Sequence, residues 1–125
     1  MMMLVLARRL GRGLQPRALV AIVFLALLRP ASAFQPGSKA ELKIAVNEWC
    51  AGTSPGSYGG EHISNWDTVL ITDMEDLFRD KHTFNDNVSS WNTSSVTTMR
   101  GMFNGALAFN QPIGSWNTGS VTTMR

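Results

Sequence analysis

The sequence predicts an α/β repeat: a short solenoid with one short helix and one short strand in each 25-residue unit, preceded by a helical N-terminal cap. The first reason is the spacing of 25 residues that separates Trp66, Trp91 and Trp116. The second is that the segments 91–100 and 116–125 are identical at nine of ten positions. Self-similarity at a fixed period is typical of units that bury their apolar faces against neighbouring units.

Residues 1–33 have the three parts of a secretory signal peptide. Four arginines and no acid precede the apolar stretch Ala18–Leu28, and the triplet Ala-Ser-Ala follows at 31–33. The stretch of eleven residues is too short for an uncleaved membrane anchor, which takes roughly 20. We therefore expect cleavage between Ala33 and Phe34, secretion or surface display, and no stable membrane span in the mature chain.

The residues after the cleavage site also fit a different targeting signal. Phe34, Gln35 and Pro36 resemble the junction of the bipartite leaders that target complex plastids, where a Phe follows the cleavage site. A transit peptide is basic and poor in acids, whereas Glu41 and the apparent cap follow within eight residues. Plastid targeting through a bipartite leader is therefore the alternative to secretion.

Removal of the leader changes the charge balance. Five of the eleven basic residues lie within it, so the mature chain carries six against nine acids, a net charge of −3. This balance argues against a nucleic acid partner, which requires a basic patch on the folded domain. Cys50 is the only cysteine, so no intramolecular disulfide forms. Its neighbours Val46 and Trp49 favour a buried apolar residue over a thiol that pairs between chains.

Residues 34–65 are expected to form the N-terminal cap and a flexible loop. An apolar run that could be helical contains Leu42, Ile44, Ala45, Val46 and Trp49. Ala51–Gly60 is dense in Gly, Ser and Pro and has the composition of a loop. A helix here would cover the open side of the first repeat.

Residues 66–125 hold the repeats, as the units 66–90 and 91–115 and the partial unit 116–125. The expected repeat core consists of Trp66, Ile71, Met74, Phe78, Phe84, Trp91, Val96, Met99, Phe103, Phe109, Trp116, Val121 and Met124. The tryptophans could instead form an exposed ladder for sugars or peptides, but repeat positions that are kept apolar favour the core.

Each unit combines two periods. In the second unit Val96, Met99 and Phe103 have the spacing of one helix face. Phe109 and Ile113 then fall on the alternation of a short strand. We therefore expect a helix of two or three turns followed by a strand.

The pattern Trp-x-Thr-x-x-Val-Thr-x-Met-x-x-Met-Phe-x5-Phe-Asn, which begins at Trp91, resembles the BspA-like leucine-rich repeat. That family comprises bacterial surface proteins and mycoplasma-type lipoproteins, and it recurs in secreted proteins of microbial eukaryotes. The resemblance covers Trp66–Arg125. It implies a leucine-rich-repeat-like solenoid, a surface location and adhesion or protein binding, and it implies no enzyme activity.

Residues for catalysis, a metal or a cofactor are not recognisable in the sequence, and we expect none. The densest acids do not follow the Asp-x-Asp-x-Asp-Gly order of a calcium loop; they are Asp73, Glu75, Asp76 and Asp80. His62 and His82 lack the His-x-x-x-His spacing with a Glu that a zinc site of this kind uses.

Two asparagines start glycosylation sequons, Asn87-Val88-Ser89 and Asn92-Thr93-Ser94. The side chains of Asn87 and Asn92 could carry glycan in a eukaryotic secretory pathway, or they could be ordinary turn asparagines. Asn117-Thr118-Gly119 is not a sequon, so the feature is not constant in the repeat.

The sequence thus predicts a secreted or cell-surface repeat protein that binds an extracellular protein or glycan. One alternative is a structural segment of a longer matrix or wall protein. Another is the truncated, non-catalytic part of a secreted enzyme. The third unit reaches Arg125 after ten residues, which favours a fragment of a longer array.

Overall fold

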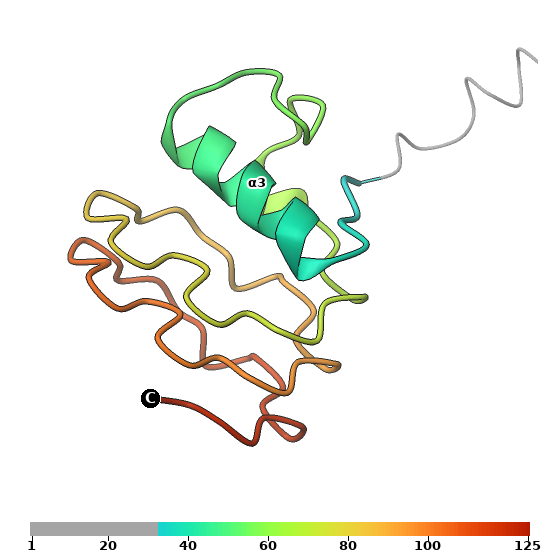
Figure 1. The fold of residues 1–125 in the computed structure, drawn as a ribbon, viewed down its shortest axis with the longest axis vertical. Helices are drawn as coiled ribbons and strands as arrows, with labels where there is room; N and C mark the ends of the chain where they lie inside the picture. The colour runs from blue at the N-terminus through green and yellow to red at the C-terminus, as the bar shows by residue number, and fades with distance from the viewer. Residues whose placement is uncertain (1–32) are drawn as a thin grey trace, which may run out of the picture. The chain divides into compact units, whose positions relative to one another are not determined.

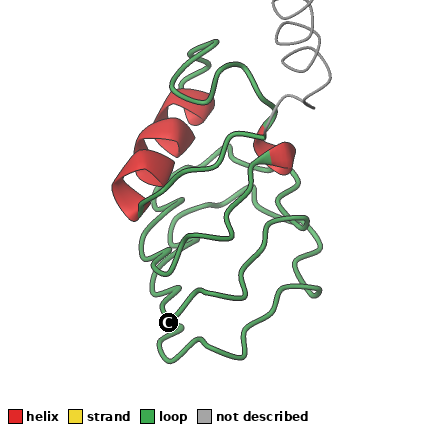
Figure 2. Cartoon of the chain, turned by 90° about the vertical axis from the view of Figure 1, so that its right-hand side faces the viewer, coloured by secondary structure: helices red, strands yellow, loops and turns green. Residues whose placement is uncertain are grey.

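The computed structural model describes residues 33–125, and the predicted leader lies outside the described residues except for Ala33. Within this range the regular elements are one α-helix, α3 (Lys39–Cys50), and one 3-10 helix, η1 (Ile63–Asn65). Figure 2 shows that the rest of the described chain runs as loops and turns. None of the described helices has the length and apolarity needed to cross a membrane.

The prediction of an α/β repeat with one helix and one strand per unit is wrong. The segment expected to be helical in the second unit is a series of turns, because Gly101 and Gly105 have φ angles of 59° and 75°. Asp76 and Asp80, at the equivalent positions of the first unit, have φ angles of 55° and 58°. A left-handed residue at every fourth position interrupts a right-handed helix before it can propagate.

The expected strands are also absent from residues 33–125. The only β-type pairing there consists of isolated parallel bridges, Asp73 with Thr98 and Thr98 with Thr123. The strand expected at 109–113 does not form. Pro112 lies within it and lacks a backbone N–H to donate to a neighbouring strand.

The repeat units are irregular coils that stack on one another with their backbones in register (Figure 1). We name them coil 1 (66–90), coil 2 (91–115) and coil 3 (116–125). Backbone N–H groups at alternate positions of coil 1 donate to carbonyls 24 residues later, at 2.8–2.9 Å; the pairs are Met74 to Thr98, Asp76 to Arg100, Phe78 to Met102 and Asp80 to Asn104. The period therefore produces a ladder between coils rather than a helix within each coil.

The core lies between the coils. Trp66 and Trp91 stack with ring centroids 6.2 Å apart, and Phe78 and Phe103 stack at 5.4 Å. The side chains of Trp66, Trp91 and Trp116 are only 2%, 3% and 8% exposed. The Trp91 indole N–H donates to the Ile63 carbonyl of η1, and the Trp116 indole N–H donates to the Val88 carbonyl of coil 1. The tryptophans are thus packing residues whose polar atoms are satisfied internally.

Not every expected core residue is covered. Phe103, Phe109 and Val121 are only partly buried, and Met124 is 59% exposed. The equivalent of Met124 in coil 1, Met74, is fully buried because coil 2 lies over it. Nothing in the described residues covers Met124 in the same way.

Helix α3 packs against coil 1. The Ser38 hydroxyl accepts a hydrogen bond from the Glu41 N–H and caps the helix. Leu42, Ala45 and Val46 form the buried face. Ile44, part of the same apolar run, is 54% exposed because it lies on the opposite side.

Two lysines of α3 bind the edge of coil 1. Lys39 pairs with the Asp73 carboxylate at 2.9 Å, and Lys43 donates to the carbonyls of Asp76 and Leu77. These contacts attach the helix to the side of coil 1 that has no coil before it.

Candidate functional site

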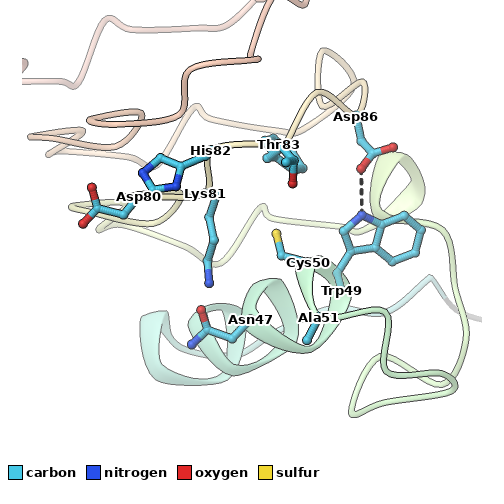
Figure 3. Close-up of a pocket in the computed structure, with 10 residues that line it drawn as sticks. Asn47, Trp49, Cys50, Ala51, Asp80, Lys81, His82, Thr83 and Asp86 are labelled. Carbon is cyan, nitrogen blue, oxygen red and sulfur yellow. Dashed lines mark hydrogen bonds between the residues drawn. The ribbon is translucent and has the colours of Figure 1, made fainter.

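A groove lies between the C-terminal part of α3 and the segment 80–86 of coil 1 (Figure 3). Its volume is about 440 Å³. The lining residues are Asn47, Trp49, Cys50, Ala51, Asp80, Lys81, His82, Thr83, Phe84 and Asp86. We call it the α3 groove.

Trp49 closes one end of the α3 groove. Its indole N–H donates to the Asp86 carboxylate at 2.9 Å, which joins the end of the helix to coil 1. The ring also makes edge-to-face contacts with Tyr58, His62 and Trp66 at centroid distances of 5.6, 4.8 and 6.1 Å. Trp49 is therefore held on several sides, and this end of the groove is preformed.

The coil wall of the α3 groove is also fixed. Asp80 is left-handed, and the N–H of Lys81 donates to the Phe78 carbonyl at 3.1 Å. Phe84 stacks on Phe78 with a centroid distance of 4.1 Å. A buried aromatic pair thus supports the loop that carries the polar side chains.

Lys81 lines this space together with the acidic residues Asp80 and Asp86. Its side chain crosses the groove toward Asn47 and Cys50 (Figure 3). Among residues 33–125 its ammonium group has no hydrogen bond and no ion pair, although the residue is partly buried. An ammonium group without a partner among the described residues offers its N–H donors to an anionic or strongly polar ligand group.

The electrostatics around Lys81 have two further consequences. Desolvation, followed by repulsion from Lys81, lowers the pKa of Lys43. Desolvation raises the pKa of the Cys50 thiol, and this outweighs the opposite effect of Lys81. The thiol is neutral near pH 7, and a neutral thiol is a poor nucleophile. An ammonium, an amide, an imidazole, a hydroxyl and two carboxylates surround the space of the groove.

Cys50 itself differs from the expectation. The sequence favoured burial, but the residue is exposed. It is the last residue of α3, and its thiol lies along the groove, where it is only partly desolvated.

The sequon asparagines lie away from the groove lining. Asn87 and Asn92 are both exposed, and each side-chain oxygen accepts a hydrogen bond from the N–H two residues later. In the part of the chain that the structure describes, no three His, Cys, Asp or Glu residues are grouped so that they could hold a metal ion.

Sequence reasoning missed the α3 groove. Trp49 and Asp86 are 37 residues apart and belong to no spacing motif. The segment 80–86 contains one apolar residue, Phe84, and has no pattern that indicates a ligand contact at Lys81. Only the packing of α3 against coil 1 brings these side chains together.

A second hollow, of about 510 Å³, lies on the face of the last coils and is mostly apolar. Its lining residues are Met99, Gly101, Met102, Phe103, Asn104, Ile113, Trp116, Thr118, Met124 and Arg125. The equivalent side chains of coil 1, such as Met74 and Phe78, are covered by coil 2. We therefore assign this hollow to the stacking surface of the coils rather than to a ligand site.

The stacked coils and the aromatic ladder define a repeat protein with a 25-residue unit. The family model described as "Mycoplasma protein of unknown function, DUF285" matches residues 51–125, which is more than half of the chain. The chain belongs to this family. No curated protein and no solved structure matches the chain. The family match begins after α3, so the helical wall of the groove lies outside it.

Proposed function

We propose that this chain is a secreted or cell-surface binding module of the BspA-like type, which engages an extracellular protein or glycan through the α3 groove. The observation that carries the proposal is Lys81, a partly buried residue whose ammonium group faces a preformed polar groove and has no partner among residues 33–125. Preformed concave sites with a few convergent polar groups are typical of ligand recognition.

Export is supported by the position in the sequence at which contacts with the folded domain begin. The Phe34 carbonyl accepts a hydrogen bond from the Asp67 N–H at 2.9 Å, and its ring contacts Trp66 at a centroid distance of 5.2 Å. Pro36 is buried, and Ser38 caps α3. Phe34 is the residue after the expected cleavage site. An unfolded, basic transit peptide has no place between Phe34 and α3, which favours secretion over plastid targeting.

Cys50 provides a reporter for the groove, because it is the only cysteine in the chain and lies in the groove wall. The experiment measures the alkylation rate of Cys50 in the leader-free chain while a panel of oligosaccharides and surface proteins is added. A ligand in the groove slows alkylation. The same panel is tested by direct binding to the immobilised protein.

Two variants separate groove binding from binding elsewhere. Lys81→Gln removes the groove cation and should weaken binding at least tenfold. Arg100→Gln is the control, since it removes an exposed cation that does not line the groove. Binding that leaves Cys50 fully reactive and is indifferent to Lys81→Gln would place recognition on another surface. The absence of specific binding across the panel would refute the module.

A further inference from the structure

Asn87 and Asn92 have the same local geometry. The Asn87 side-chain oxygen accepts a hydrogen bond from the Ser89 N–H at 2.9 Å. The Asn92 side-chain oxygen accepts from the Ser94 N–H at 3.1 Å and from the Ser94 hydroxyl at 2.6 Å. In both turns the amide oxygen is directed back to the chain, toward the third residue of the sequon.

This geometry leaves the two amide nitrogens without a hydrogen bond to residues 33–125. Both residues are exposed, and neither Nδ2 atom donates a hydrogen bond to any residue of 33–125. Asn65 differs in this respect, since its Nδ2 donates to Glu61 at 2.9 Å. A substituent on Nδ2 of Asn87 or Asn92 therefore displaces no internal contact.

The backbone around the two sequons is also kept intact by other bonds. The Asn92 carbonyl accepts from the buried Thr68 hydroxyl at 2.9 Å, and the buried side chains of Val88 and Trp91 hold the segment between the sequons. These contacts hold the backbone of coils 1 and 2 in place, while the side chains of Asn87 and Asn92 remain exposed.

We propose that both asparagines carry N-linked glycans in the exported protein. In the transfer step, the Nδ2 atom attacks the anomeric carbon of an oligosaccharide carried on a polyprenyl pyrophosphate. A C–N bond forms, the C–O bond to the pyrophosphate breaks, the lipid pyrophosphate leaves and the amide loses one proton to a base of the transferase. This inference rests on the proposed export, because transfer takes place in the secretory pathway.

A natural control lies one unit further along. Asn117 makes the same turn, with its side-chain oxygen accepting from the Gly119 N–H at 2.9 Å, but Gly119 lacks the hydroxyl of a sequon. Asn117 is exposed as well. Gly119→Ser would complete a third sequon on an existing turn.

The experiment expresses the full chain with its own leader in a eukaryotic cell line and analyses the secreted protein by mass spectrometry before and after amide-cleaving glycosidase. We expect two glycans on the wild type, and enzymatic release leaves aspartate at positions 87 and 92. Asn87→Gln and Asn92→Gln each remove one glycan. Ser89→Ala and Ser94→Ala do the same while they keep the asparagine, so loss of glycan is separated from a folding defect. Gly119→Ser adds a third glycan.

The outcomes distinguish this inference from the proposed function. Secreted wild-type protein without glycan overturns the inference and leaves export standing. A glycan on only one of the two residues overturns the assignment of the other. Protein that is retained in the cell with an intact leader contradicts export, and with it both proposals.

Discussion

Coil 1 and coil 2 carry the same motif but are buried to different extents. Phe78 is fully buried in coil 1, whereas its equivalent Phe103 is only partly buried in coil 2. Coil 1 lies between α3 and coil 2, while coil 3, with its ten residues, covers only a portion of coil 2. Burial at a repeat position is therefore set by the neighbouring coil and not by the residue type, as expected when each unit covers the next.

The largest predicted effect tests this difference directly. Phe78→Ala should destabilise the leader-free chain by about 3–5 kcal/mol, because it leaves a cavity among stacked rings. Phe103→Ala should cost clearly less, since the ring already contacts solvent. The measurement is the free energy of unfolding from urea titration. If Phe78→Ala prevents folding, Phe78→Leu against Phe103→Leu keeps the comparison. Equal losses at the two positions would show that the coils are equally covered in solution.

The second prediction concerns the left-handed positions that replaced the expected helix. A Cβ atom at Gly101 would collide with Oδ1 of Asp76, and the φ angle of 59° is unfavourable for any L-residue. Gly101→Ala should lower the free energy of unfolding by about 1–2 kcal/mol from the conformation alone, and the collision adds to this.

Gly114 is the matched control for this substitution. It has no positive φ, and nothing lies within 4 Å of its added Cβ atom. Gly114→Ala should leave stability unchanged or slightly raised. A helix at 96–103 in solution would reverse the order, because alanine at position 101 would then stabilise it.

These positions show what the sequence could and could not predict. The 25-residue period was visible because every coil places a tryptophan at the same point of the ladder. The left-handed backbone conformation could not be predicted, because coil 2 has glycines at these positions and coil 1 has aspartates. Asp76 and Asp80 are left-handed in coil 1, as Gly101 and Gly105 are in coil 2. An apolar spacing of three and four residues fits a helix and a series of turns equally well.

The α3 groove was beyond the sequence for a different reason. Trp49 and Asp86 meet because α3 packs on coil 1 through its apolar face and is attached there by Lys39 and Lys43. Such contacts lie more than 30 residues apart and have no repeat to reveal them. Local patterns predicted a helix that covers the first repeat, whereas the side-chain contacts that form the groove required the three-dimensional structure.

A third prediction concerns the threonine at the same point of each coil. The Thr68 hydroxyl donates to the Asn92 carbonyl at 2.9 Å and the Thr93 hydroxyl to the Asn117 carbonyl at 3.0 Å, and both side chains are buried. Thr68→Val and Thr93→Val should each cost about 1 kcal/mol, the net value of one hydrogen bond. Thr118→Val removes an exposed hydroxyl and should be neutral. A cost at Thr118 similar to that at Thr93 would contradict the ladder.

The smallest effect concerns a contact that coil 1 has and coil 2 lacks. Partial burial opposes ionisation of Asp73, but hydrogen bonds from the Glu75 N–H and the Lys39 ammonium outweigh it and hold its pKa below the ordinary value. Thr98 occupies the equivalent position of coil 2 and has no charge. Since the pKa of Asp73 is lowered on folding, its carboxylate stabilises the protein at pH values above about 4 and loses this contribution as the pH falls through the folded pKa.

The urea midpoint of wild type should therefore exceed that of Asp73→Asn by a small, constant amount between about pH 5 and 7, and the difference should vanish in stronger acid. Lys39→Gln should reduce the difference without abolishing it, because the Glu75 N–H still donates to the carboxylate. A difference that persists unchanged at low pH would mean that the amide alters packing rather than charge. The helix would then be attached to coil 1 by its apolar face and by the hydrogen bonds of Lys43, without a contribution from the Asp73 charge.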